Sequence, residues 1–391
     1  MPGHIFLLAG EPWGDAVGAR LMQALRDQEP GGIAFAGVGG PRMASCGLQS
    51  LFPMEELALG GKAETLPRMP RLWRRLAQAA HEVDRRRTDL VLTIASLGVA
   101  LRLQRRLAAR PLLRVHYGAP QTWAWREGRA ARLARDLDHL LALLPFEPAL
   151  FRRYGVPCSY VGHPIFEEAP AAVDGARFRR RYELPADAPL LCLLPGSKAN
   201  EIRPHLLVLE EAVALIWRHI SQLRLVLPTI PRMAPLVKQL VARWKLPVLV
   251  LEDRAERFDA YDASWLAIAA SGTVSLETAL AGLPAITIYR TGPLTAWLAR
   301  RLILAPHANP INLILGRPAV PELLQEDCRP DRIAAAATRL IGDPALRQDQ
   351  QTALAEAVTR LRGDDERPPS HRAAARVLEL LADRRNVRRT A

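Results

Sequence analysis

Short runs of apolar residues recur along the chain, and most of them lead through a turn into a stretch with apolar residues at helical spacing. This order of strand, turn and helix is typical of doubly wound parallel sheets, so the pattern predicts an α/β protein with one such sheet in each half. The expected strands are 4–9, 33–38, 90–94, 112–117 and 140–144, then 190–194, 223–227, 247–251, 265–270 and 285–289. The expected helices include 16–26, 66–80, 99–109, 200–217 and most of 329–384.

The stretch 263–290, ASWLAIAASGTVSLETALAGLPAITIYR, contains the clearest such unit. Its turn, Ser271-Gly272-Thr273, would place backbone N–H groups and two hydroxyls at a helix N-terminus, where an anion is favoured. Glu277 follows one turn into the helix, where a carboxylate is able to accept hydrogen bonds from a ribose. The turn PGSK at 195–198 has the same character. Together they predict a nucleotide-diphosphate pocket, and the alternative is that these residues are ordinary helix caps.

Two further turns are expected at the ligand-binding edge of the first sheet. The sequence GEPWGD follows the first strand and GGPR follows the second. Ligands of open α/β sheets bind beyond the carboxyl ends of the strands. Neither turn is a GxGxxG fingerprint, and the chain contains no P-loop pattern.

Composition indicates the size of the protein and the charge of its expected partner. The chain has 391 residues, 49% of them hydrophobic, so it is long enough for about two or three domains with buried cores. Its formal charge of +13 favours an anionic partner such as phosphate or acidic lipid. The four cysteines are far apart and fit a reducing cytosol. No signal peptide or transmembrane helix is expected, so any contact with a membrane is peripheral.

The segment 66–80, LPRMPRLWRRLAQAA, interleaves arginine with Met, Leu and Trp. A helix of this kind suits an anionic membrane surface, whereas the alternative is a surface helix with a solvated basic face. The polar, proline-containing segment 167–187 is expected to be a linker or a domain junction. The tail at 384–389, with four arginines, is expected to be solvated and poorly ordered.

Ten short motifs, in order, resemble lipid-A-disaccharide synthase, the bacterial glycosyltransferase of family 19. They are AGEPWGD (9–15), GVGGPRM (37–43), LPRMPRL (66–72), WAWREGR (123–129), ALLPFE (142–147), YGVPCSYVGHP (154–164), LLPGSKANEI (193–202), ASGTVSLETAL (270–280), YRTGPLTAWLARRL (289–302) and PELLQED (321–327).

The resemblance implies a GT-B architecture, with two Rossmann-like domains and the active site in the cleft between them. The first domain (1–168) would hold the acceptor and the lipid, and the second (169–355) the UDP-sugar. Helices in 356–391 would pack back on the first domain and end in the basic tail. It implies inverting transfer of 2,3-diacylglucosamine from its UDP derivative to 2,3-diacylglucosamine 1-phosphate, giving a β-1,6-linked lipid A disaccharide 1-phosphate and UDP. No cofactor, essential metal or nucleic acid is implied. The enzyme would lie on the cytoplasmic face of the inner membrane, and a homodimer is left open.

The same resemblance assigns residues to the substrates. Donor binding is expected at Gly196, Ser197, Lys198, Glu201, Ser271, Gly272, Thr273, Glu277, Tyr289, Arg290, Asn312 and Gln325. Lipid or membrane contact is expected at Arg68, Met69, Arg71, Leu72, Trp73, Arg74 and Arg75, with a second contact at Trp297, Arg300 and Arg301. For Asn312 and Gln325 a purely structural role is an equal alternative.

Three positions depart from the family pattern. Ala95 stands where the family has an aspartate after a strand, Lys198 replaces an arginine, and Trp13 replaces a small serine. The change at Lys198 keeps charge but loses bidentate contact with phosphate. Because the aspartate is lost, a catalytically impaired or altered-specificity homologue is the alternative to an active enzyme.

An active enzyme still needs a base for the acceptor hydroxyl. Glu11 and Asp15 are the leading candidates, although Asp15 also suits a helix cap. His116 and His163 are weaker candidates, since a lone histidine near a strand end is more often structural. The tripeptide Asp136-Leu137-Asp138 resembles a DxD metal motif, but it is placed away from the nucleotide half and is interpreted as incidental.

Overall fold

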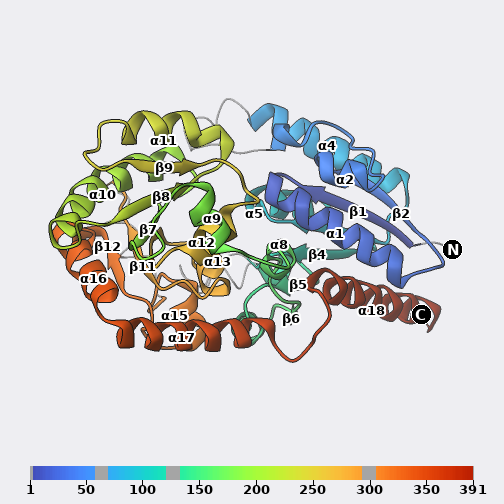
Figure 1. Ribbon diagram of the computed structural model, residues 1–391. Helices are drawn as coiled ribbons and strands as arrows, with labels where there is room; N and C mark the ends of the chain where they lie inside the picture. Colours follow the sequence, from blue (N-terminus) through green and yellow to red (C-terminus); the bar gives the residue numbers. More distant parts are fainter. Residues whose placement is uncertain (1–2, 58–68, 120–132, 293–304, 391) are drawn as a thin grey trace. The chain divides into compact units, whose positions relative to one another are not determined.

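The computed structural model describes residues 3–57, 69–119, 133–292 and 305–390. Within them the chain forms two compact units, one made of 1–166 with 363–391 and the other of 167–362. Each unit is built on a parallel sheet with helices packed against it (Figure 1). Strands β3 (Leu90–Ile94) and β10 (Leu266–Ala270) are buried along their whole length, as expected where helices cover both faces of a parallel sheet.

The sheet of the first unit has the order β2-β1-β3-β4-β5-β6. Its strands are β1 (Gly3–Ala9), β2 (Ile33–Val38), β3, β4 (Leu113–Tyr117), β5 (His139–Ala142) and β6 (Cys158–Tyr160). The helices are α1 (Pro12–Gln28), α2 (Pro41–Ser45), the 3-10 turn η1 (Met54–Leu57), α4 (Met69–Arg85), α5 (Leu97–Arg106), α7 (Glu147–Arg153), α8 (Ile165–Glu168) and α18 (Pro369–Thr390).

The sheet of the second unit has the order β12-β11-β10-β7-β8-β9. Its strands are β7 (Leu190–Leu194), β8 (Arg224–Pro228), β9 (Val248–Leu251), β10, β11 (Ala285–Tyr289) and β12 (Glu322–Leu324). The helices are α9 (Gly175–Arg181), α10 (Ala199–His219), α11 (Ala234–Val241), α12 (Arg257–Ala263), α13 (Val274–Leu280), α15 (Pro310–Leu315), α16 (Pro330–Gly342) and α17 (Pro344–Arg362), with 3-10 turns η4 (Pro231–Met233) and η5 (Gln325–Asp327).

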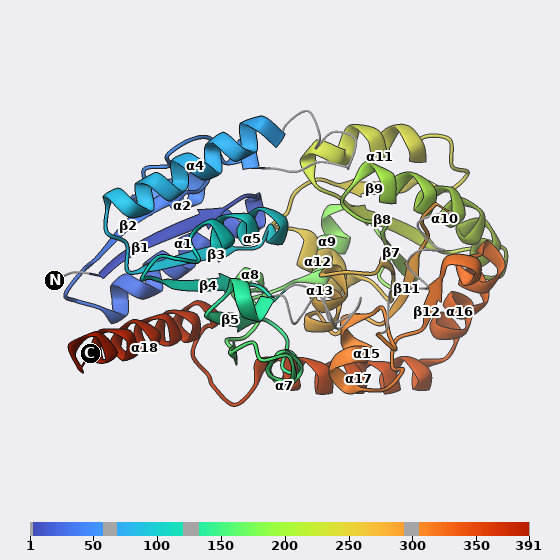
Figure 2. The ribbon, with the colours of Figure 1, turned by 180° about the vertical axis from the view of Figure 1, so that it is seen from behind.

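The C-terminal helix α18 belongs to the first unit, although the whole of the second unit precedes it in the chain. It lies along α1 in both views (Figures 1 and 2). Ala373, Ala374 and Val377 are fully buried in the same core as β1 and α1. Burial of the Val377 side chain alone stabilises the docked helix by roughly 1 to 2 kcal/mol.

The two predicted sheets are confirmed, and most of the strands lie within one residue of their expected bounds. Three local predictions are wrong in whole or in part. Helix α1 begins at Pro12, because proline is favoured at the first helical position, so most of the expected GEPWGD turn is helix. The segment 167–187 begins at the boundary between the two units, as a domain junction does, but it is not an open linker because it contains α9, which packs on α12. The basic tail continues α18 to Thr390.

Candidate functional site

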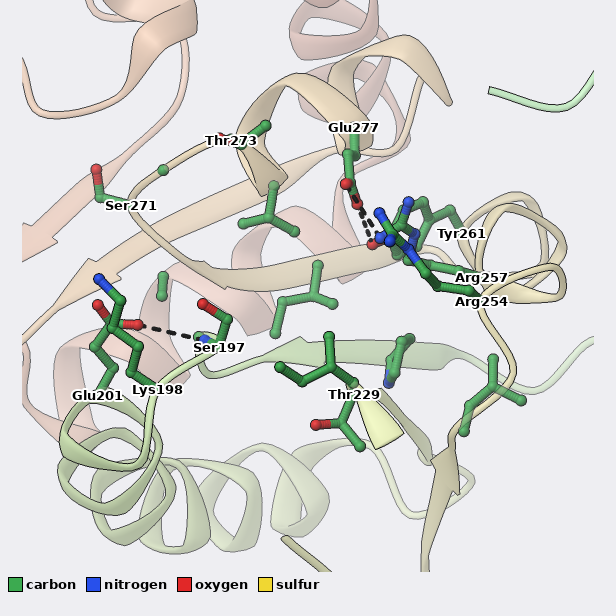
Figure 3. A pocket seen from close by; sticks show the side chains of 18 of the residues that line it. Ser197, Lys198, Glu201, Thr229, Arg254, Arg257, Tyr261, Ser271, Thr273 and Glu277 are labelled. Carbon is green, nitrogen blue, oxygen red and sulfur yellow. Dashed lines mark hydrogen bonds and ion pairs between the residues drawn. The ribbon is translucent and has the colours of Figure 1, made fainter. Parts of the chain in front are cut away.

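One pocket of the second unit opens where the strand order reverses. The chain passes from β7 outward to β8 and β9, and it returns to β10 on the other side of β7. The connections that follow β7 and β10 therefore leave the sheet in opposite directions, and the crevice between them is the usual ligand site of such sheets. The pocket has a volume of about 400 Å³, and Figure 3 shows the side chains around it. It is lined by Leu194, Gly196, Ser197, Lys198, Glu201, Pro228, Thr229, Ile230, Leu251, Asp253, Arg254, Arg257, Tyr261, Ala270, Ser271, Gly272, Thr273, Val274 and Glu277.

The turn after β7 forms one side of this pocket. Gly196 has φ of +115°, and a side chain there would also collide with the carboxylate of Glu201, so glycine is required. Glu201 accepts a hydrogen bond from Ser197 N at 3.3 Å and orders the turn. His205, buried on α10, donates from Nδ1 to Pro195 O and accepts from Arg290 N at Nε2. On this side of the pocket, the exposed Lys198 contributes a positively charged ammonium group.

The turn after β10 faces it. Gly272 has φ of +152°, a conformation that other residues rarely adopt, and its Cα faces open space. Ser271 Oγ donates to Ala308 O at 2.7 Å, so its oxygen lone pairs remain as acceptors. Thr273 is the N-cap of α13, but its hydroxyl makes no capping hydrogen bond. The predicted turn is therefore present, and Thr273 is not used as an ordinary side-chain cap.

A buried carboxylate closes the deep end of the pocket (Figure 3). Glu277 Oε2 accepts from Tyr261 OH at 3.0 Å, and its Oε1 lies 3.2 Å from Arg257 Nη1. Burial raises the pKa of Glu277, while Arg257 and the tyrosine hydroxyl oppose that rise. Burial also raises the pKa of Tyr261, which keeps its hydroxyl protonated as a donor. This end combines a hydrogen-bond acceptor with a guanidinium group.

Sequence reasoning missed several residues of this pocket. Arg254, Arg257 and Tyr261 lie in EDRAERFDAYDAS, which has the composition of a solvated surface. Thr229 follows β8 directly, in a turn of the kind that was recognised after β7 and β10. The signal that was available is position: each of these residues follows the carboxyl end of a predicted strand.

Four of the predicted donor residues do not line this pocket. Asn312 is fully buried, and its amide binds Val320 O, Glu322 Oε1, Ala319 N and Val320 N. Its hydrogen-bonding capacity is used within the protein, so we assign it a structural role. Gln325 Oε1 accepts from Thr291 N at 3.3 Å, and Tyr289 packs against the ring of His205. Arg290 is exposed at the end of β11.

The first sheet also reverses its strand order, between β1 and β3. Glu11 follows β1 and is exposed, and Ala95 and Ser96 follow β3 with φ of +54° and +42°. Glu11 Oε1 lies 3.4 Å from Ser96 N and accepts its hydrogen bond. Glu11 is therefore an exposed carboxylate at the ligand-binding edge of this unit. Trp13 packs partly buried against the core, so the indole is accommodated within the fold.

Asp15 is engaged within the fold. It is buried in the first turn of α1, and its carboxylate accepts hydrogen bonds from Gly40 N, Arg42 N and Met43 N at 2.8 to 3.0 Å. These donors belong to the N-terminus of α2, so Asp15 caps the following helix instead of its own. A carboxylate with three internal donors is poorly placed to accept a substrate proton.

The other candidates of the first half are held by structural contacts. His116 Nδ1 pairs with Thr93 Oγ1 at 2.8 Å, and burial lowers the pKa of His116 to about 4. His163 Nδ1 accepts from Ile165 N, and burial lowers the pKa of His163 to about 4 as well. Asp136 and Asp138 bind Arg105 and Arg114, which fits their interpretation as incidental.

Helix α4 only partly matches the expected membrane helix. Leu72 is 1% exposed and packs in the core, so its predicted lipid contact is wrong. Arg75 makes a bidentate contact with Glu56. Of the predicted contact residues that the structure describes, Arg71, Trp73 and Arg74 are exposed, while Met69 is partly buried against the core. The apolar face of α4 covers its own sheet, which helical periodicity alone does not distinguish from a lipid-facing surface. Arg68, Trp297, Arg300 and Arg301 lie outside the described residues.

Comparison with known proteins decides the family. The model of the lipid-A-disaccharide synthetase family matches residues 5–377. A lipid-A-disaccharide synthase of Rhodospirillum centenum is 48% identical over 387 residues, covering 98% of this chain and 96% of that protein. The chain belongs to the lipid-A-disaccharide synthases. The resemblance seen in the short motifs is thereby confirmed, and with it the assignment to the glycosyltransferases that form the lipid A disaccharide.

Solved structures confirm the GT-B fold of this synthase family member. The Staphylococcus aureus MnaA–UDP structure superposes with a TM-score of 0.65 at 13% identity, covering 96% of this chain and 95% of that one. MurG of Acinetobacter baumannii gives a TM-score of 0.56 at 14% identity, covering 97% and 100%. At these identities the likeness concerns the fold alone. Among the described residues, none of the helices is long and apolar enough to cross a bilayer.

Proposed function

We propose that this chain transfers 2,3-diacylglucosamine from its UDP derivative to the 6-hydroxyl of 2,3-diacylglucosamine 1-phosphate, with inversion at the anomeric carbon. The acceptor oxygen forms a bond to that carbon, the bond from the carbon to the diphosphate breaks, and UDP leaves. The pocket between β7 and β10 carries the proposal, because it gathers a lysine, two arginines, hydroxyls and a buried carboxylate at the switch point of a family member. Coverage of nearly the full length of named synthases supports the substrate assignment.

We assign the two ends of the pocket to different parts of UDP. The diphosphate binds Ser197, Lys198 and the Ser271–Thr273 turn, where backbone donors and a cation stabilise the charge of the leaving group. Glu277 accepts from the ribose hydroxyls, and Arg257 opposes the rise in the pKa of Glu277 that burial causes. The turn of Thr229 and Ile230, on the β8 side of the pocket, accommodates the uracil.

For the base we propose Glu11. It is exposed at the carboxyl edge of the first sheet, whereas Asp15 is buried and engaged by three backbone donors. The Ser96 N–H that contacts Glu11 comes from the turn in which Ala95 replaces the family aspartate. In this assignment Glu11 accepts the proton of the 6-hydroxyl as its oxygen attacks, which is the usual task of a general base.

We further propose that the enzyme acts on the cytoplasmic face of the inner membrane, bound peripherally. Both substrates carry acyl chains, and α4 presents Arg71, Trp73 and Arg74 to the outside. Arginine together with exposed tryptophan suits an interface of anionic lipid. Dimer formation remains a separate proposal, which sedimentation of the purified protein would test.

One observation favours a second candidate. Ala95 removes the carboxylate of the family from the β3 turn, so a homologue that binds these substrates without efficient transfer is the competing function. A turnover assay distinguishes the active enzyme from the non-catalytic homologue. It measures the release of UDP from UDP-2,3-diacylglucosamine, with the acceptor in detergent micelles, for wild type and for Ala95→Asp. We expect wild type to turn over. Turnover by Ala95→Asp alone would assign wild type to the second candidate.

A further inference from the structure

A second hollow of the first unit combines arginine with an exposed tryptophan. It lies between α4 and α5, which pack side by side (Figure 2), and has a volume of about 570 Å³. Trp73 of α4 forms one wall, and the outer face of α5 forms the other. The lining residues on α5 are Gly98, Leu101, Arg102, Arg105 and Arg106, which recur at helical spacing on one face.

The positive charge of this hollow is largely unbalanced. Arg105 Nε binds Asp136 Oδ2 at 2.7 Å, and Arg102 Nη1 donates to Gly98 O. Among the residues that the structure describes, Asp136 is the one carboxylate paired with these three arginines. Arg102 and Arg106 are four residues apart, and like charges at this spacing destabilise a helix. An anion between them would turn this repulsion into attraction.

The helix dipole does not explain the arrangement. Cations are favoured in the last turn of a helix, which accounts for Arg105 and Arg106. Arg102 lies a turn earlier, and the dipole gives no reason for Trp73 to remain 46% exposed opposite it. Guanidinium groups bind phosphate through paired hydrogen bonds, and an indole ring offers an apolar wall for a sugar or an acyl chain. The combination selects an amphiphile that carries phosphate.

The hollow is also connected to the proposed base. Helix α5 begins directly after the Ala95–Ser96 turn that contacts Glu11, and Gly98 belongs to both the first turn of the helix and the wall of the hollow. Arg102 lies four residues beyond Gly98, which is about 6 Å along the helix axis. In the acceptor, the hydroxymethyl group that carries the reacting 6-hydroxyl is on C5 and the phosphate is on C1, and these two carbons flank the ring oxygen. A sugar with its hydroxyl at Glu11 would therefore hold its phosphate close by, within reach of arginine side chains on the first turns of α5.

We propose that Arg102 and Arg106 bind the phosphate of the acyl-glucosamine acceptor, and that Trp73 packs against its sugar or an acyl chain. The inference rests on the proposed function, because it takes the acceptor and the position of the base from it. The phosphate group is the recognised chemistry, and an anionic phospholipid headgroup is its other source. The test therefore measures substrate kinetics and membrane binding separately.

The test variant is Arg102→Gln/Arg106→Gln. Its matched control is Arg153→Gln/Arg180→Gln, which removes two exposed arginines from α7 and α9 and leaves the hollow intact. We expect KM for the acceptor to rise about tenfold or more in the test variant, as the loss of charge-assisted contacts implies, with KM for the UDP-sugar unchanged. The control should keep both values of KM.

Binding assays keep the proposal independent of turnover. Calorimetry with glucosamine 1-phosphate reports the phosphate without acyl chains, and co-sedimentation with phosphatidylcholine vesicles, with and without phosphatidic acid, reports the headgroup. Loss of glucosamine 1-phosphate binding in the test variant alone supports the proposal even if wild type proves inactive, which would sink only the proposed function. Loss confined to phosphatidic acid vesicles assigns the hollow to the membrane and overturns the acceptor assignment. Equal behaviour of test and control variants overturns the phosphate site itself.

Discussion

Glu11 Oε1 accepts a hydrogen bond from Ser96 N at 3.4 Å and so connects the end of β1 with the end of β3. These two strands flank the point where the first sheet reverses its order. The contact holds an exposed carboxylate at the edge where ligands of such sheets bind. It also ties that carboxylate to the turn that contains Ala95.

Glu11→Gln is expected to lower kcat by roughly a hundredfold or more while changing KM little, because a general base contributes about 10²–10⁴-fold and its amide does not accept a proton. The glutamine is isosteric and keeps an oxygen for the Ser96 N–H. Steady-state release of UDP checks both constants. A kcat within twofold of wild type would assign the base to another residue.

Asp15→Asn should behave differently. The carboxylate receives three backbone N–H groups of the α2 turn, and the substitution replaces one acceptor oxygen by a donor that faces those N–H groups. We expect a loss of about 2 to 4 kcal/mol in the free energy of unfolding, because charged acceptors are lost and buried donors are left unpaired. Urea unfolding measures the loss. A fully stable Asp15→Asn variant with very low kcat would instead make Asp15 the catalytic group.

Ala95→Gly is expected to stabilise the protein by about 1 kcal/mol. Ala95 has φ of +54°, and the left-handed conformation costs roughly 1 to 2 kcal/mol for a residue with a Cβ. Glycine also gains freedom in the unfolded chain, so the net effect is smaller than the relieved strain. Ala108→Gly, at an exposed position after α5, is the control and should not stabilise. A lower urea midpoint for Ala95→Gly would contradict the strain argument.

Arg257→Gln tests the deep end of the donor pocket. Arg257 lies 3.2 Å from the buried Glu277 carboxylate, and without it burial would raise the pKa of Glu277 further. We expect KM for the UDP-sugar to rise by about tenfold, with KM for the acceptor unchanged. Arg180→Gln, on the exposed face of α9, is the matched control. The double variant Arg257→Gln/Glu277→Gln tests whether the two side chains act together. If its change in the free energy of UDP-sugar binding equals the sum of the two single changes, they act independently.

The sequence predicted the parts of the donor pocket that are local. The turns at 195–198 and 271–273 lie between a strand and a helix that adjoin in the chain, so hydrophobic periodicity was sufficient to find them. Arg257 and Tyr261 reach the same pocket because α12 packs against β7 and β8 in space, which periodicity does not show. Leu72 shows the converse error, since periodicity identified an apolar helix face without indicating that the sheet of its own unit covers it.

Acid should destabilise the first unit through its buried histidines. Burial lowers the pKa of His116, His139 and His163 from 6.5 to about 4. Below pH 6.5 the unfolded chain therefore binds more protons than the folded one, and stability falls until the pH reaches about 4. The Glu82 pKa, lowered to about 2 by Arg85, adds its own loss only below pH 4.5.

His116→Asn isolates one of these contributions. The side-chain amide can replace the contact of Nδ1 with Thr93 Oγ1, but it does not titrate in this range. Lowering the pKa of His116 from 6.5 to about 4 corresponds to roughly 3 kcal/mol. Between about pH 7 and about pH 4.5, wild type should therefore lose up to that much more free energy of unfolding than the variant. Urea unfolding across this range gives the two slopes. Parallel slopes for wild type and His116→Asn would mean that the folded protein protonates His116 as readily as the unfolded chain does.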